Sequence, residues 1–181
     1  MRKVIIILLL LVIVSGCGIL ENNRFSSYKH YDLINEDIMV HSYVDNENIT
    51  RKYAIADITT KSSEAIIYGL FYQVDKNDYI LLETLEISGN ANDAIKFHGN
   101  HLYTINTGTN SGNFEYVLDA EKIKKTKLTF EFSSGFLTRS IQNVTENEIY
   151  YYAYTNDETS GNSINVKLKC SLSTYKCELI K

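Results

Sequence analysis

Three cysteines carry the best-defined chemistry in this chain of 181 residues. Cys17 ends a hydrophobic N-terminal stretch, whereas Cys170 and Cys177 lie close together near the C-terminus. If residues 172–175 form a hairpin loop, these two cysteines stand opposite each other on neighbouring strands, and a disulfide there would stabilise the fold by about 2 kcal/mol. Two free buried thiols or half of a metal site are the alternatives, although no second Cys or His pair lies nearby at zinc-like spacing.

The first seventeen residues have the layout of an export signal. Arg2 and Lys3 form a basic start, residues 4–14 are an unbroken apolar run, and Val14-Ser15-Gly16-Cys17 closes it. This pattern resembles the lipobox of bacterial lipoprotein signal peptides. The resemblance implies cleavage directly before Cys17 and a diacylglyceryl group joined to the Cys17 sulfur by a thioether.

An uncleaved transmembrane helix is the alternative for the same stretch. Spanning a bilayer takes roughly 20 apolar residues, whereas the hydrophobic region of a signal peptide takes about 7 to 15. The eleven residues 4–14 fit the signal peptide. We therefore expect a signal peptide at residues 1–16 and a lipidated Cys17 with a polar tether at 17–36. The lipid is the one non-protein group implied, and it would place the domain on a cell membrane or outer membrane, facing outside the cytoplasm.

The histidines offer one close pair, His98 and His101, on either side of Gly99-Asn100. Gly-Asn between two strand-like runs is typical of a two-residue hairpin turn, across which the two imidazoles would be neighbours. A shared metal ion would need further ligands, and no carboxylate or third histidine follows at ligand spacing. The pair is interpreted as a turn, and no metal site is predicted.

Two loops, Asp75-Lys76-Asn77-Asp78 and Asn156-Asp157-Glu158, hold acidic residues that could bind calcium through oxygen. Neither matches the twelve-residue calcium loop, and turn formation explains Asn and Asp there as well. The chain also lacks a Gly-x-Ser-x-Gly elbow, a local Cys–His pair and a glycine-rich phosphate loop. No enzymatic activity is predicted, although separate Ser, His and Asp residues could converge in space.

The strongest aromatic group is a tyrosine cluster in residues 150–154. On a strand, Tyr150, Tyr152 and Tyr154 share one face, and Tyr151 lies on the other. These three tyrosines form a candidate binding surface for a sugar or a protein partner, since tyrosine offers rigid amphipathic contact area. Packing between adjacent sheets is the alternative interpretation.

Composition argues against several classes of partner. Removing Arg2 and Lys3 with the signal peptide changes the formal charge from −4 to −6. An acidic domain lacks the clustered Lys and Arg that nucleic acids and anionic lipid surfaces require, and the one dense lysine cluster, at residues 122–127, is interpreted as a solvated turn and strand start. Residues 37–181 have the length of a single domain.

From about residue 37 onward, the chain consists of short β-branched and aromatic runs separated by clusters of Asn, Asp, Gly and Ser. This pattern predicts short β-strands joined by turns. Residues 63–70 and 117–125 are the only stretches that could be helical, and each is short enough to be a strand or a helical turn instead. Asn100-His101-Leu102-Tyr103 and Asn147-Glu148-Ile149-Tyr150 recur 47 residues apart. Each is preceded by a short strand, at 93–97 or 140–144, and followed by two more strands, of which the last is 127–132 or 175–180.

An earlier unit has expected strands at 38–44, 52–59, 65–74 and 79–86. Antiparallel four-stranded units at this interval resemble β-propeller blades. The prediction is an all-β fold of antiparallel four-stranded meander repeats, with about three blade-like units in a partial propeller-like arrangement. A β-sandwich is the alternative. Three blades are fewer than a closed propeller uses, so self-association is one expectation.

The sequence indicates a membrane-anchored envelope lipoprotein that acts as a binding or structural module. An envelope protein or glycan is the expected class of partner, and nucleic acid is not expected. A small inhibitory or immunity lipoprotein and an envelope hydrolase without a visible catalytic motif are the alternatives.

Overall fold

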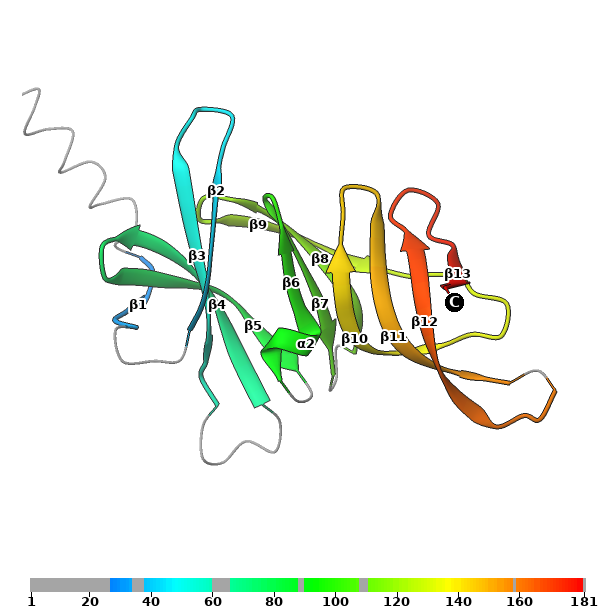
Figure 1. The fold of residues 1–181 in the computed structure, drawn as a ribbon. Coiled ribbons are helices and arrows are strands. Elements are labelled where there is room, and N and C mark those ends of the chain that lie inside the picture. Colours follow the sequence, from blue (N-terminus) through cyan, green and yellow to red (C-terminus); the bar gives the residue numbers. More distant parts are fainter. Residues whose placement is uncertain are drawn as a thin grey trace, which may run out of the picture.

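The computed structural model describes residues 27–33, 38–59, 66–87, 90–107, 111–157 and 159–180. Within these ranges almost every element is a β-strand, and the strands form three antiparallel sheets that follow one another along the chain (Figure 1). The all-β prediction is confirmed, and so is the division into three meander units.

The first sheet is a meander with one added strand. Its order is β1-β5-β4-β3-β2. The strands are β1 (His30–Tyr31), β2 (Ile38–Val44), β3 (Thr50–Asp57), β4 (Ile66–Asp75) and β5 (Asp78–Ile87). The four strands expected in this unit agree with β2 to β5 within about two residues at each end. The described part of the 63–70 stretch lies in β4 and is not helical.

The second sheet has the order β6-β7-β8-β9 and follows a four-residue helix. Its elements are α2 (Ala91–Ala94), β6 (Ile95–His98), β7 (His101–Asn106), β8 (Gly112–Asp119) and β9 (Lys122–Leu128).

The prediction for the last strand of this sheet, 127–132, is wrong, because β9 begins five residues earlier. Ala120 takes a positive φ of 50° in the turn from β8, so the chain reverses within the 117–125 stretch and forms no helix there. The lysine cluster suits a strand because Lys122 and Lys124 face solvent, while the ammonium of Lys125 lies 4.9 Å from the ring centroid of Phe114.

The third sheet has the order β10-β11-β12-β13, as expected for the third unit. Its strands are β10 (Leu137–Val144), β11 (Glu148–Asn156), β12 (Ser163–Ser171) and β13 (Cys177–Ile180). The segment between β9 and β10 runs along the outer edge of this sheet before it enters β10. There the Glu131 amide donates to the Tyr175 carbonyl at 2.7 Å, and the Cys177 amide donates to the Glu131 carbonyl at 2.8 Å.

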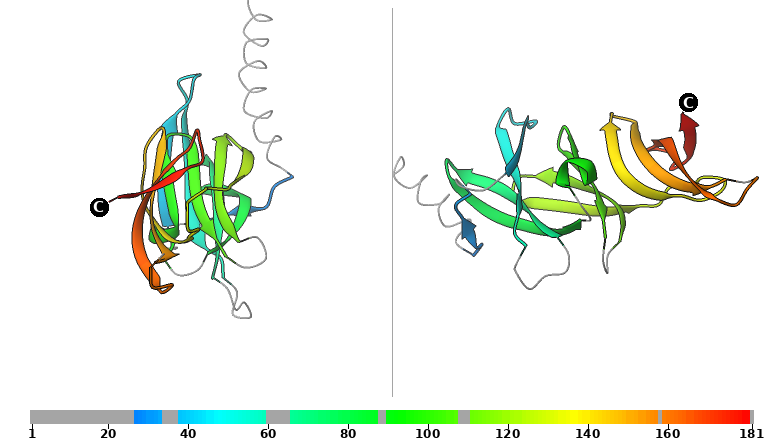
Figure 2. Two further views of the ribbon diagram at one scale, coloured as in Figure 1. Left: turned by 90° about the vertical axis from the view of Figure 1, so that its right-hand side faces the viewer. Right: turned by 60° about the horizontal axis from the view of Figure 1, so that its bottom comes forward.

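One hydrophobic core joins all three sheets. Its largest fully buried side chains include Tyr53 of the first sheet, Tyr116 of the second and Tyr151 of the third. α2 and β6 lie against β10, and β7 lies against β5 and β10, so neighbouring sheets pack on each other in chain order (Figures 1 and 2). The three sheets therefore fold as one body.

The two ends of this row of sheets differ. At the first sheet, a second apolar cluster is covered by the N-terminal segment: Leu33 is buried, and the Tyr31 ring meets the Phe71 ring edge-on at 5.1 Å between centroids. The segment expected as a tether, 17–36, is therefore shorter at its C-terminal end, because residues 30–33 belong to the folded domain. At the opposite end, the outer face of the third sheet is exposed at Tyr152 and Tyr154.

Candidate functional site

The tyrosines of β11 alternate between the core and the solvent. Tyr151 is 1% exposed and lies in the core, whereas Tyr152 and Tyr154 are 38% and 37% exposed. The predicted division of the tyrosines between two faces is therefore observed. We call the outer surface of the third sheet, which carries Tyr150, Tyr152 and Tyr154, the tyrosine face. Packing between sheets describes Tyr151 and does not describe Tyr152 or Tyr154.

Two cations lie over the exposed rings of the tyrosine face. The Lys167 ammonium is 5.4 Å from the ring centroid of Tyr152, its direct partner on β12. The Arg139 guanidinium is 5.5 Å from the ring centroid of Tyr154, and its Nη1 donates a hydrogen bond of 3.0 Å to the tyrosine hydroxyl. Such cation–π contacts hold both charges in place at the surface.

Tyr150, the third tyrosine of the face, has a different environment. Its hydroxyl donates to a carboxylate oxygen of Glu148 at 2.7 Å, and this hydrogen bond, with a smaller contribution from Lys169, holds the pKa of Glu148 below its usual range. The Lys169 ammonium lies 3.6 Å from a carboxylate oxygen of Glu148 and 2.5 Å from a carboxylate oxygen of Glu178. This corner is occupied by its own ion pairs, so the open part of the face is the half that carries Tyr152 and Tyr154.

A groove of about 1280 Å³ begins at this half of the face and runs between the second and third sheets. Its floor is apolar and includes Ile105, Leu128 and Phe130. Its polar lining is rich in side-chain amides, from Asn90, Asn113, Gln142 and Asn165. Thr138 donates to the Asn113 side-chain oxygen at 3.0 Å and fixes one of these amides. A surface of aromatic rings, amides and fixed cations suits binding better than bond cleavage.

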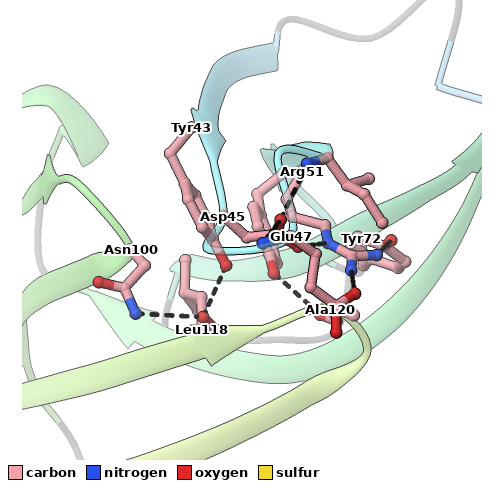
Figure 3. A network of polar contacts seen from close by, with 10 residues as sticks. Tyr43, Asp45, Glu47, Arg51, Tyr72, Asn100, Leu118 and Ala120 are labelled. Carbon is pink, nitrogen blue, oxygen red and sulfur yellow. Dashed lines mark hydrogen bonds and ion pairs between the residues drawn. The ribbon is translucent and has the colours of Figure 1, made fainter.

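A second, polar cleft of about 720 Å³ lies between the first and second sheets (Figure 3). Arg51 fills it: its Nε donates to Asp45 at 2.6 Å and its Nη1 donates to the Tyr72 hydroxyl at 3.2 Å. The backbone amide of Ile49 donates to Asp45 as well and is the main reason that the pKa of this carboxyl lies below its ordinary value. The cleft is thus occupied by its own ion pair.

Tyrosine hydroxyls from the first sheet bond to the turn region of the second sheet beside this cleft. Tyr43 donates to the Leu118 carbonyl at 2.7 Å, and the buried Tyr53 donates to the Ala120 carbonyl at 2.9 Å (Figure 3). Burial raises the pKa of Tyr53, so its hydroxyl stays protonated and continues to donate its hydrogen bond to Ala120. The network joins two sheets, so we assign it a structural role.

The histidine pair forms the predicted hairpin turn. His98 and His101 are partners at the ends of β6 and β7. His101 Nδ1 lies 2.8 Å from Glu115, and Tyr103 donates to the same carboxylate oxygen at 2.9 Å. Across the described ranges, no group of three or more His, Cys, Asp or Glu side chains is arranged to hold a metal ion. The cluster lines a small cavity of about 310 Å³ with no serine or cysteine in its lining.

The acidic loops act in turn formation. Asp157 accepts hydrogen bonds from the Thr159 amide and from the hydroxyls of Thr159 and Ser160, which together hold its pKa low. In the other loop, Asp75 accepts from the Lys76 amide at 2.7 Å and Asp78 contacts His30 at 2.8 Å. Glu158 lies outside the described residues.

Cys170 and Cys177 form a disulfide between β12 and β13, as predicted. They are direct register partners, with 4.0 Å between their Cα atoms, and Cys170 is fully buried. The bond ties the short last strand to the sheet at the point where residues 129–136 also contact it. The metal alternative for these cysteines is excluded by the bond itself.

We expect the double variant Cys170→Ser/Cys177→Ser to lose about 2 kcal/mol of unfolding free energy, because the bond closes a short loop in the unfolded chain. Urea denaturation of the oxidised protein and of the variant measures this difference. A thiol count on the denatured, unreduced protein gives the pairing directly. Two reactive thiols in that assay, beyond any at Cys17, would show that the bond does not form.

Cys17 and the expected signal peptide lie outside the described residues. Within the part of the chain that the structure describes, no helix is long and apolar enough to cross a membrane. Lipidation of Cys17 therefore stays a prediction from the sequence.

Comparison with known proteins adds no family to these observations: no family model, no curated protein and no solved structure matches the chain.

Sequence reasoning missed Arg139, Lys167 and the groove. Lys167 is one of several lysines in the C-terminal part of the sequence, and nothing in its spacing marks it as the partner of Tyr152. Arg139 lies at a register shift between β10 and β11, which local sequence does not indicate. The tyrosine spacing was the one signal in the sequence that pointed to this exposed surface.

Proposed function

We propose that this protein is a lipid-anchored envelope lipoprotein that acts as a binding module, with the tyrosine face and the adjoining groove as its binding site. The diacylglyceryl group on Cys17 would hold it on a membrane surface outside the cytoplasm. The folded domain would present its ligand site to the envelope.

The observation that carries this proposal is the exposed half of the tyrosine face. Tyr152 and Tyr154 are large aromatic side chains that are each more than one-third exposed, although the core of the same sheet is buried. The groove of about 1280 Å³ adjoins them and offers amides from three strands. Aromatic contact area with nearby hydrogen-bonding groups is what binding sites commonly use.

Structural roles explain the other candidate groups. In the second cleft, Asp45 is bonded to Arg51 and to backbone amides, and Asp157 bonds the turn of its own loop. Among the described residues, the tyrosine face and its groove combine exposed aromatic rings with side-chain amides. The proposal therefore concerns binding and includes no catalytic step.

Capture from native envelope tests the proposal. The lipidated protein would be cross-linked in intact cells and recovered, alongside a Tyr152→Ser/Tyr154→Ser variant and a lipid-free version of residues 18–181. We expect a protein or glycan that is recovered with the wild type, is lost with the double variant, and is reduced without the lipid. Recovery of the same material by the double variant would remove the tyrosine face from the proposal, and turnover of an envelope polymer would favour an enzyme.

A further inference from the structure

The charge of the tyrosine face differs from the charge of the chain. The chain carries a formal charge of −4, whereas the four strands of the third sheet carry three cations, Arg139, Lys167 and Lys169, against two carboxylates, Glu148 and Glu178. Both carboxylates lie next to Lys169. Among the described residues, Arg139 and Lys167 form no ion pair with an acidic side chain.

These two cations are held where a ligand would meet them. Each lies over an exposed tyrosine ring, and Arg139 also donates to the Tyr154 hydroxyl. Because that hydroxyl accepts from arginine, its own proton is available for donation to an anion. A fixed guanidinium with free N–H groups, a hydroxyl donor and an ammonium match a carboxylate or phosphate group.

The remaining groove favours a glycan over an acidic peptide. A peptide commonly binds by adding a strand to a sheet edge, but α2 and β6 already lie against β10, the edge strand beside the groove. The groove instead offers side-chain amides, from Asn113, Gln142 and Asn165, which both donate and accept hydrogen bonds, as the hydroxyls of a sugar require. The carboxylates of Asp93 and Glu131, which also line the groove, would accept from sugar hydroxyls.

We infer that the tyrosine face binds an anionic polysaccharide: carboxylate or phosphate groups contact Arg139, Lys167 and the Tyr154 hydroxyl, and the sugar rings lie in the amide-lined groove. This inference rests on the proposed function, since it names the ligand class for the same site. Binding weakens as salt concentration rises, because both cations are at the surface.

Equilibrium binding of the full-length chain, purified in detergent, tests the inference. The probes are polygalacturonate, whose sugars carry carboxylates, a phosphorylated dextran, unmodified dextran and poly-L-glutamate. We expect binding to at least one of the two anionic polysaccharides, and the choice between them identifies the anionic group. Neutral dextran should not bind, and poly-L-glutamate should bind more weakly.

A matched pair of double variants separates this site from general charge. Arg139→Gln/Lys167→Gln and Lys52→Gln/Lys124→Gln each remove two surface cations, but the second pair lies on the first and second sheets. We expect the first variant to weaken binding about tenfold, because the free-energy contributions of two exposed charge contacts are lost together. The second variant should leave binding nearly unchanged.

Several outcomes would overturn the inference. These are no binding of either anionic polysaccharide, equal losses in both double variants, and stronger binding of poly-L-glutamate. If the wild-type chain still captures an envelope partner through Tyr152 and Tyr154 while the glycan inference fails, the proposed function stands and only the ligand class is wrong.

Discussion

Replacing Cys17 with alanine should abolish lipid anchoring and leave the protein either unprocessed or released from the membrane. A diacylglyceryl group supplies two acyl chains, and each buried methylene contributes about 0.8 kcal/mol to membrane partitioning. A single chain gives only marginal attachment, so both chains act together in retention. Alanine has no sulfur for the thioether, and the variant loses the entire contribution.

Cell fractionation with mass spectrometry of the mature N-terminus measures this effect. The wild type should lack residues 1–16, carry an acyl adduct on Cys17 and sediment with membranes. Cys170→Ala/Cys177→Ala is the control, because it removes the other two cysteines and their disulfide, leaves Cys17 in place and should remain anchored. A Cys17→Ala protein that is still cleaved before position 17 and still bound to membranes would contradict the lipoprotein prediction.

Tyr151→Ala should destabilise the domain far more than Tyr152→Ala, although the two residues are neighbours on β11. Tyr151 is 1% exposed, and its ring centroid lies 5.8 Å from that of Phe130. Its replacement by alanine leaves a cavity that lowers the free energy of unfolding by about 3–5 kcal/mol. Tyr152 is more than one-third exposed, and surface substitutions of this kind stay within about 0.5 kcal/mol. Urea denaturation followed by tyrosine fluorescence measures both.

Tyr151→Phe separates the ring from its hydroxyl. Among the described residues, the buried Tyr151 hydroxyl has no hydrogen-bond partner, and removing an unpaired buried polar atom does not weaken a core. We expect Tyr151→Phe to be at least as stable as the wild type, whereas Tyr151→Ala is strongly destabilised. Equal stabilities for Tyr151→Ala and Tyr152→Ala would mean that the faces of β11 are assigned wrongly.

The meander units were predictable because each strand is a short β-branched and aromatic run bounded by turn residues. The expected strand at 38–44 coincides with β2, and the repeat around Tyr103 and Tyr150 identified β7 and β11. The hairpins at Gly99-Asn100 and between the two C-terminal cysteines followed from turn chemistry and spacing. Local pattern therefore determined most of the secondary structure.

Features that depend on contacts between sheets were not predictable. The start of β9 was placed too late because its lysines were interpreted as a solvated turn and strand start. In the structure Lys125 lies over the Phe114 ring, and its ammonium is 3.3 Å from the carboxylate of Glu83 on the first sheet. The path of residues 129–136 along β13 depends on an isolated parallel β-bridge between the backbones of Glu131 and Lys176. The candidate site was only partly predictable for the same reason. Its tyrosines could be identified from the sequence, but the positions of the cations beside them depend on the pairing of β10 and β12 with β11.

The covered first sheet also limits how copies of this protein could assemble. Growth of a filament by repeated head-to-tail addition requires two complementary open surfaces on every subunit. Here Tyr31 and Leu33 cover part of one terminal surface with the subunit's own chain, so the two ends of the row of sheets are not equivalent. If copies associate through the outer sheets, this segment would have to fit between them, which disfavours repeated head-to-tail addition.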